Sequence, residues 1–233
     1  MLGIIIGIAS VVSIVALGHG SKEKILKDIN AMGTNTVDIF PGTGWGDRKA
    51  ARIRTLNERD IRLLNDQPYV DSVSPNVSRS MNLTYKADEV VSQVIGVGEN
   101  YFRVKAFDLA IGAYFTSKDV KNQAQVVVID NNTKEKLFPN SSNPIGEVIL
   151  AGKVALKVIG VLEKKQGMMG AGENLQIFTP YTTAMHRLFG IKYLSSITVR
   201  IKDTVDTQVA EQGIISLITR SHGTKDFYTS NLD

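Results

Sequence analysis

The chain has 233 residues, of which 43% are hydrophobic, so it can bury the core of one large domain or two small ones. Its formal net charge is only +4, and its basic residues are interspersed with acidic ones, which argues against a nucleic-acid-binding protein. Because it has no cysteine, it can form neither a disulfide nor a thiolate metal site.

The first 18 residues, MLGIIIGIASVVSIVALG, carry no charge, and Ser10 and Ser13 are their polar side chains. As a helix they would span about 27 Å, slightly less than the hydrocarbon core of a bilayer. Apolar residues lie all round this helix, unlike in a core helix, and no basic residue precedes Lys22, unlike in a signal peptide. We therefore expect residues 1–19 to be the outer part of a transmembrane helix.

Small residues recur along one face of this helix. Gly3 and Gly7 have GxxxG spacing, and Ser10 falls on the same face. Such a face lets two membrane helices approach closely, so we expect Gly3, Gly7 and Ser10 to form a helix-packing surface. Glycine is also frequent in membrane helices without such a role, and the sequence leaves that alternative open.

The segment that follows alternates helices and strands. A helix is expected over 20–32, and TNTVDIF (34–40) has the alternation of a strand, with Val37 and Ile39 on one side and Asp38 on the other. After a loop, Thr55 and Glu58 have capping-box spacing and predict a short helix. The stretch 69–78 then reads as the next strand.

The middle of the chain is rich in strands. Helices are predicted at 99–105, 132–138 and 182–190, and strands at 80–86, 89–97, 107–115, 124–130, 147–153, 155–164 and 175–181. Gly152–Lys153 reads as a hairpin turn, because Val154 follows it and the preceding glycine of a phosphate-binding loop is missing.

The end of the chain returns to the pattern of the beginning. A strand at 195–202 precedes a helix over about 206–221, with Val209, Leu217 and Ile218 among its buried candidates, and a short strand at 226–230. We therefore predict an α+β fold in which both ends, 20–80 and 195–233, form one α/β subdomain. The β-rich stretch 81–194 would be a second subdomain inserted between them.

Two features are candidate docking surfaces. Trp45 precedes a basic run of Arg48, Lys49, Arg52 and Arg54, which could bind an acidic partner or could simply be a solvated loop. Met168 and Met169 lie among glycines, which suggests an exposed hairpin tip that adapts to varied partners. A methionine pair packed back onto the sheet is the alternative.

No motif for chemistry stands out. GTGWG (42–46) lacks the helix and the Gly-Lys-Ser/Thr of a phosphate-binding loop. His19, His186 and His222 are far apart in the sequence, and His222 is expected at a helix end, near the negative end of the helix dipole. We predict no catalytic residue, no metal site and no cofactor site in this chain.

Stretches along the whole chain resemble MacB-type ABC transporter permeases, the macrolide exporters of Gram-negative bacteria. They are the opening MLGIIIGIASVVSIVALG, GTNTVDIFPG (33–42), WGD (45–47), AQVVVID (124–130), LFP (137–139), VIGV (158–161), PYTT (180–183), SSITVRIK (195–202) and HGTKDFYTSNLD (222–233). Trp45 departs from the family, which often has Phe there. The resemblance implies a porter-like subdomain made from both chain ends with an inserted second subdomain.

The resemblance also implies a function. The whole protein would be a homodimer in the bacterial inner membrane, with this soluble part in the periplasm. It would bind ATP and Mg through a nucleotide-binding domain that is not present in this chain. It would work with a periplasmic membrane-fusion adaptor and an outer-membrane channel to export macrolides or small secreted peptides. Alternatives are a lipoprotein-release permease domain and a signal-anchored extracytoplasmic sensor or binding module.

Overall fold

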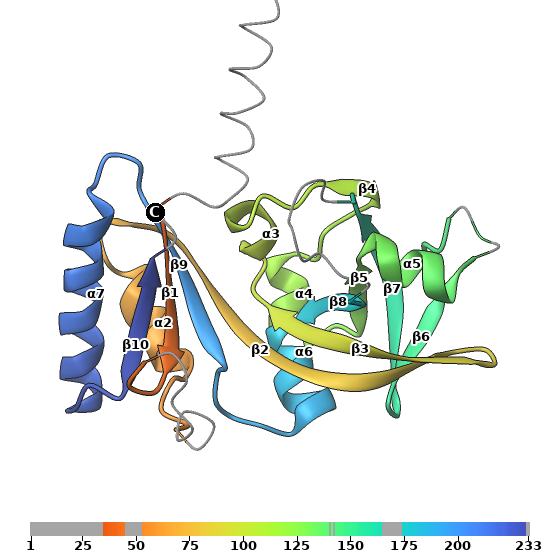
Figure 1. Cartoon of the computed structure of the whole chain (residues 1–233), viewed down its shortest axis with the longest axis horizontal. Coiled ribbons are helices and arrows are strands. Elements are labelled where there is room, and N and C mark those ends of the chain that lie inside the picture. The colour runs from red at the N-terminus through yellow and green to blue at the C-terminus, as the bar shows by residue number, and fades with distance from the viewer. Residues whose placement is uncertain (1–34, 45–52, 140, 142, 165–173, 232–233) are drawn as a thin grey trace, which may run out of the picture.

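The computed structural model describes residues 35–44, 53–139, 141, 143–164 and 174–231 (Figure 1). Several predictions concern residues outside these ranges: the membrane helix 1–19, the helix 20–32, and the candidates Gly3, Gly7, Ser10, Trp45, Arg48, Lys49, Arg52, Met168 and Met169. Within the described ranges, no helix combines the length and the hydrophobicity needed to cross a membrane.

Both ends of the described chain lie in one antiparallel sheet. Its strands are β1 (Thr36–Pro41), β9 (Ser196–Ile201), β10 (Phe227–Asn231) and the first half of β2 (Val70–Tyr85), in the order β10-β1-β9-β2. Val37 of β1 lies opposite Asn231 of β10, so the two ends meet at the same end of this terminal sheet (Figure 1).

Helices α2 (Glu58–Asn65) and α7 (Thr207–His222) cover one face of the terminal sheet. The capping box of α2 is made by Asn57 and Asp60, so the predicted pairing of Thr55 with Glu58 was wrong by two residues. The backbone N–H of Asn57 donates to Asp60 Oδ2 over 2.9 Å, which satisfies a donor that the helix itself leaves free.

The buried stripe of α7 consists of Thr207, Ala210, Ile214 and Ile218, and it packs in one core with Val37 and Ile39 of β1. Leu217 is half-buried beside this core. The prediction for Val209 was wrong, because this residue lies one position off the stripe and is 68% exposed.

A long hairpin joins the terminal sheet to the rest of the molecule. β2 was predicted as two strands, but it is one strand of 16 residues that pairs with β9 through Asn76 and then with β3 (Asp88–Val97). The predicted boundary between residues 80 and 81 falls within this strand. β2 therefore passes without a break from one part of the fold to the other (Figure 1).

The β-rich part contains a closed ring of strands. Its further members are β8 (Gln176–Pro180), β5 (Val126–Ile129), β7 (Val154–Leu162) and β6 (Val148–Ala151). The described residues pair in the sequence β2-β3-β8-β5-β7-β6 and back to β2, while β4 (Leu109–Gly112) adds to β7. Closure removes exposed sheet edges from this strand ring.

Turns and short helices complete the ring. Gly152 has a φ of 60° in the turn between β6 and β7, which confirms the predicted hairpin turn.

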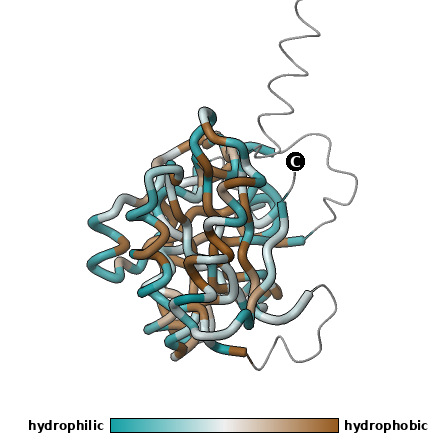
Figure 2. The backbone as a smooth tube through the Cα atoms, turned by 90° about the vertical axis from the view of Figure 1, so that its left-hand side faces the viewer, coloured by the Kyte–Doolittle hydropathy of each residue, from teal (hydrophilic) through white to brown (hydrophobic). Residues whose placement is uncertain are grey.

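The short helices that pack around the ring are α3 (Tyr101–Val104), α4 (Ser117–Lys121), α5 (Asn131–Leu137), α6 (Tyr181–Thr183) and the π-helical turn η2 (Ala184–Phe189). Figure 2, seen from the α7 side, shows hydrophobic segments along the interior strands. The predicted α+β class is confirmed.

Candidate functional site

Helix α3 contacts the face of the terminal sheet that α2 and α7 leave uncovered. Asp38 alternates along β1 with Val37 and Ile39, so its carboxylate points away from their core. On that side Lys105, which directly follows α3, donates from Nζ to Asp38 Oδ2 over 2.9 Å. The two side chains are only 21% and 15% exposed, so this ion pair is largely shielded from solvent.

The same carboxylate is held by the neighbouring strands. The Thr198 hydroxyl of β9 donates to Asp38 Oδ1 over 2.5 Å, and Asn76 Nδ2 of β2 donates to Thr198 Oγ1 over 2.9 Å. Three strands and the end of α3 therefore share one hydrogen-bonded chain. Because these hydrogen bonds and the Lys105 ion pair replace contacts with water, partial burial of the Asp38 carboxylate costs little free energy.

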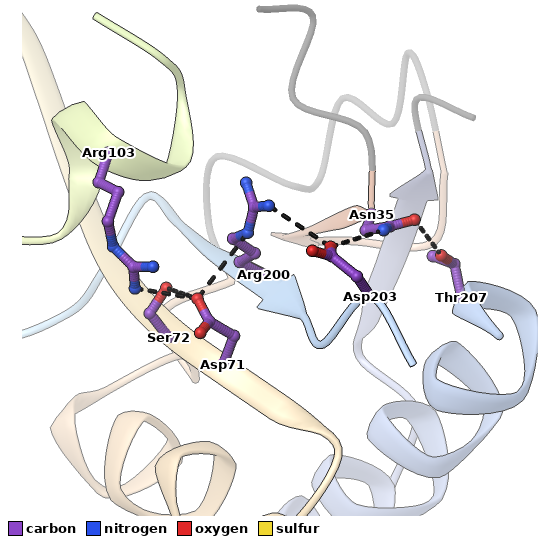
Figure 3. Close-up of polar contacts among 7 residues, drawn as sticks. All are labelled: Asn35, Asp71, Ser72, Arg103, Arg200, Asp203 and Thr207. Carbon is purple, nitrogen blue, oxygen red and sulfur yellow. Dashed lines mark hydrogen bonds and ion pairs between the residues drawn. The ribbon is translucent and has the colours of Figure 1, made fainter. Parts of the chain in front are cut away.

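Figure 3 shows a second set of contacts between α3 and the terminal sheet. Arg103 of α3 reaches Asp71 of β2, with Nη2 2.9 Å from Oδ2. The Ser72 hydroxyl donates to the same oxygen over 3.1 Å, and Arg200 Nε of β9 lies 3.8 Å from it. The Arg103 side chain is 57% exposed, so each of these contacts contributes little alone.

The polar contacts continue to the first described residue. Arg200 Nη2 lies 3.5 Å from Asp203 Oδ1, and Asn35 Nδ2 donates to that oxygen over 3.0 Å. The Thr207 hydroxyl, at the start of α7, donates to Asn35 Oδ1 over 3.2 Å (Figure 3). The network therefore extends from α3 across the sheet to the point where the chain enters β1. We call the contacts of Arg103 and Lys105 with Asp71 and Asp38 the α3 bridge.

Aromatic rings join α3 to the strand ring. The Tyr101 ring lies 6.0 Å from Phe107 and 5.8 Å from Phe178, measured between centroids. Burial, and secondly the charge of Asp38, raise the pKa of Tyr101 to about 12, so its hydroxyl stays neutral. Helix α3 is thus anchored to the strand ring by apolar contacts and to the terminal sheet by charges.

A second polar group lies on the other face of the terminal sheet. His222, the last residue of α7, places Nδ1 2.8 Å from Asp226 Oδ1 and Nε2 3.2 Å from Asp60 Oδ2 of α2. Burial lowers the pKa of His222, but the hydrogen bonds and charges of Asp226 and Asp60 outweigh it and raise the pKa above its ordinary value. The prediction that His222 lies at a helix end is confirmed.

Both polar groups are occupied by contacts within the chain. Both ring nitrogens of His222 face carboxylates, so neither is available to a substrate. In the described ranges no group of three or more His, Cys, Asp or Glu side chains could hold a metal ion. Both polar groups connect secondary-structure elements that are far apart in the sequence.

One residue of the predicted basic run is described. The Arg54 guanidinium lies over the Tyr193 ring, 4.8 Å from its centroid.

Neither the α3 bridge nor the His222 cluster was predicted from the sequence. Asp38, which is the one charged residue of β1, was the available signal.

Comparison with known proteins shows which family the chain belongs to. Residues 1–217 match the family model of the MacB-like periplasmic core domain. The chain belongs to this family. It is 52% identical over its whole length to the macrolide export ATP-binding/permease protein MacB of Pectobacterium atrosepticum, and 50% identical to MacB of Neisseria meningitidis. It covers 36% of the length of each of these relatives, so it spans about a third of their chains.

Solved structures share the fold. The periplasmic region of MacB from Actinobacillus actinomycetemcomitans matches with a TM-score of 0.79 at 37% identity, over 89% of this chain and 94% of that one. The extracellular domain of the transporter YknZ from Gram-positive bacteria matches with a TM-score of 0.70 at 24% identity, over 84% and 100% of the two chains. At 24% identity, the match to YknZ shows a shared fold and nothing about function. The chain is thus a periplasmic domain of a MacB-type ABC permease.

Proposed function

We propose that this chain docks a periplasmic membrane-fusion adaptor and couples cytoplasmic ATP hydrolysis to the export of macrolides or small secreted peptides. The names of the relatives, which combine macrolide export, ATP binding and a permease, support this proposal. ATP and Mg would bind a nucleotide-binding domain outside this chain, so the chain itself would be non-catalytic. The whole protein would act as an inner-membrane homodimer, and the adaptor would connect it to an outer-membrane channel.

One observation carries the proposal: the strands at the two ends of the described chain are neighbours. Because β1 and β10 pair from Val37–Asn231 to Pro41–Phe227, forces that enter at either end act on the same sheet. A sheet held by such pairing and by the α7 core moves as a body rather than stretching.

The α3 bridge extends this body to the strand ring. Movement of the terminal sheet reaches the ring through the unbroken strand β2 and through the pairs Lys105–Asp38 and Arg103–Asp71. The chain crosses between the two parts in β2 and in the segment from η2 to β9, and either crossing could bend. The bridge adds a noncovalent connection to these two crossings, and each further connection opposes relative rotation.

The test uses the full-length protein that carries this chain, with its adaptor and channel. Lys105→Met breaks the shielded ion pair while keeping the length of the side chain, and we expect macrolide resistance of the cells to fall several-fold. Cytoplasmic ATPase activity should persist, so hydrolysis becomes uncoupled from export. The exchange of charges in Asp38→Lys with Lys105→Asp should restore part of the resistance.

Lys121→Met serves as the matched control, because Lys121 is an exposed lysine on α4 outside the α3 bridge. Resistance in the control should equal that of the wild type. Unchanged resistance in Lys105→Met and in Asp38→Asn, at equal protein levels, would contradict the coupling role of the bridge.

A further inference from the structure

Four cations gather around the segment that links η2 to β9. Arg187 lies on η2 and Lys192 in the following loop, while Arg79 comes from β2 and Arg54 from the loop before α2. All four residues are exposed. Two contacts join the contributing segments: Leu194 donates its N–H to Leu56 O, and Ser78 donates to Ser195 Oγ. We call Arg54, Arg79, Arg187 and Lys192 the distal basic surface.

These charges are not neutralised within the part of the chain that the structure describes. Not one of the four takes part in an ion pair there, whereas Arg103, Lys105 and Arg200 all do. The sequence from Asn174 to Lys202 contains no Asp or Glu at all. Glu58, the nearest carboxylate along the chain from Arg54, forms a hydrogen bond with Tyr181 and no ion pair with Arg54 among the described residues, so it offsets at most one of the four charges. The surface therefore carries a local excess of positive charge.

Two of the arginines are held in place by aromatic rings. Arg79 lies 5.0 Å from the centroid of the Phe189 ring and donates from Nη1 to the Phe189 carbonyl over 3.4 Å. Arg54 lies similarly over Tyr193. A guanidinium held this way keeps most of its five donors free and has lost part of its rotational freedom before binding.

The surface lies away from the chain ends. In Figure 1 the segment between η2 and β9 follows the lower margin of the molecule, whereas β1 begins and β10 ends toward its upper side. If the ends lead to the membrane, as the proposed function requires, the distal basic surface faces away from the lipid. The rings beneath it already carry guanidinium groups, so they do not form the free stacking platform of a nucleic-acid site.

We infer that the distal basic surface docks a carboxylate-rich surface of the adaptor protein. This inference rests on the proposed function, which supplies the adaptor, and adds where it binds and through which charges. The guanidinium group of arginine can form two parallel hydrogen bonds with one carboxylate. A positively charged surface also accelerates association with a negatively charged one.

The test compares two double charge reversals in the full-length protein. Arg187→Glu with Lys192→Glu reverses two exposed charges whose side chains form no hydrogen bond or ion pair with the described residues. Lys121→Glu with Lys136→Glu imposes the same change of net charge on α4 and α5 of the strand ring. Binding of the purified adaptor is followed by interferometry, and thermal unfolding of each variant verifies the fold.

The distal reversal should lower the association rate constant at least tenfold, while the control stays within twofold of the wild type. Wild-type association should also slow as NaCl rises from about 50 to about 300 mM. Equal binding by the wild type and the distal variant would overturn the inference and leave the proposed function intact. A wild-type protein that does not bind the adaptor would overturn both.

Discussion

The terminal sheet and the strand ring share one apolar core, but the contacts added to that core differ between them. The terminal sheet adds charged contacts: His222 lies between Asp60 and Asp226 on one face, and Lys105 binds Asp38 on the other. The ring adds a second, aromatic cluster around Phe102 and Phe178 and neutral hydroxyl–carbonyl bonds. Examples are the bonds from Thr179, Thr182 and Thr183 to carbonyl groups of residues 126, 120 and 124, at 2.9, 2.5 and 2.8 Å.

This difference implies that the two parts respond differently to their surroundings. Charged contacts change with pH and salt, whereas apolar packing and neutral hydrogen bonds do so only slightly. The stability of the terminal sheet, which contains both ends of the described chain, should therefore change with pH and salt. The stability of the strand ring should change little. The following variants test this contrast, from the largest expected effect to the smallest.

Phe102→Ala should have the largest effect, because the ring is 1% exposed and lies 4.6 Å from Tyr114 and 5.3 Å from Phe115. We expect a loss of about 3–5 kcal/mol in the free energy of unfolding. Urea unfolding of the full chain in mild detergent measures this loss, which should be the same at pH 6 and pH 8. A strongly pH-dependent loss would show that the ring also depends on charges.

The pair formed by Lys105 and Asp38 should follow. A double-mutant cycle with Lys105→Met and Asp38→Asn should give a coupling energy of about 1.5–3 kcal/mol, because hydrogen bonds between charged, shielded groups are among the stronger ones. Denaturation of the four proteins provides the cycle. A coupling energy near zero would mean that solvent screens the pair despite its burial.

His222 supplies the pH dependence. Because its folded pKa is raised, its contribution is fully present below the unfolded value near pH 6.5 and is lost as pH rises through the folded pKa. His222→Leu should therefore destabilise the chain by about 1–2 kcal/mol at acidic pH and by less at alkaline pH. Urea unfolding of wild type and variant across this range is the measurement, and a difference that grows with pH would refute the assignment.

Arg103→Gln should have the smallest effect, below about 1 kcal/mol, since the side chain is largely exposed. Raising the NaCl concentration should remove even this difference. A loss comparable to that of Lys105→Met would mean that the two pairs of the α3 bridge act as one unit.

The regular elements were more predictable than their contacts. Alternation identified the strands around Val37 and Ile197, and Gly152 marked its turn, because these signals are local. Helix α4 was missed although Thr116 and Asp119 form the same kind of capping box that was sought near Thr55. Its five residues were too few to show a helical period.

The sites could not be predicted, because they join distant residues. Lys105 is 67 positions from Asp38, and His222 is 162 positions from Asp60. Asp226, four positions after His222, is a local candidate for one of its partners. Nothing near His222 indicates the second carboxylate, since Asp60 serves its own helix as part of a capping box. Only the three-dimensional pairing of β1, β9 and β2 places α3 over Asp38.

The central claim is that the terminal sheet and the strand ring move together because the α3 bridge connects them. This chain has no cysteine of its own, so cysteines substituted at Gln212 of α7 and Lys136 of α5 are its only labelling sites, and any cysteine elsewhere in the full-length protein is replaced first. Labelled protein is mixed with an excess of unlabelled protein, so that most homodimers carry spin labels on one protomer. Double electron–electron resonance should then give one label distance that is the same with and without ATP, and a broader distribution in Lys105→Met. A wild-type distance that shifts by several ångströms between the two states, beyond the spread due to the labels, would contradict the claim.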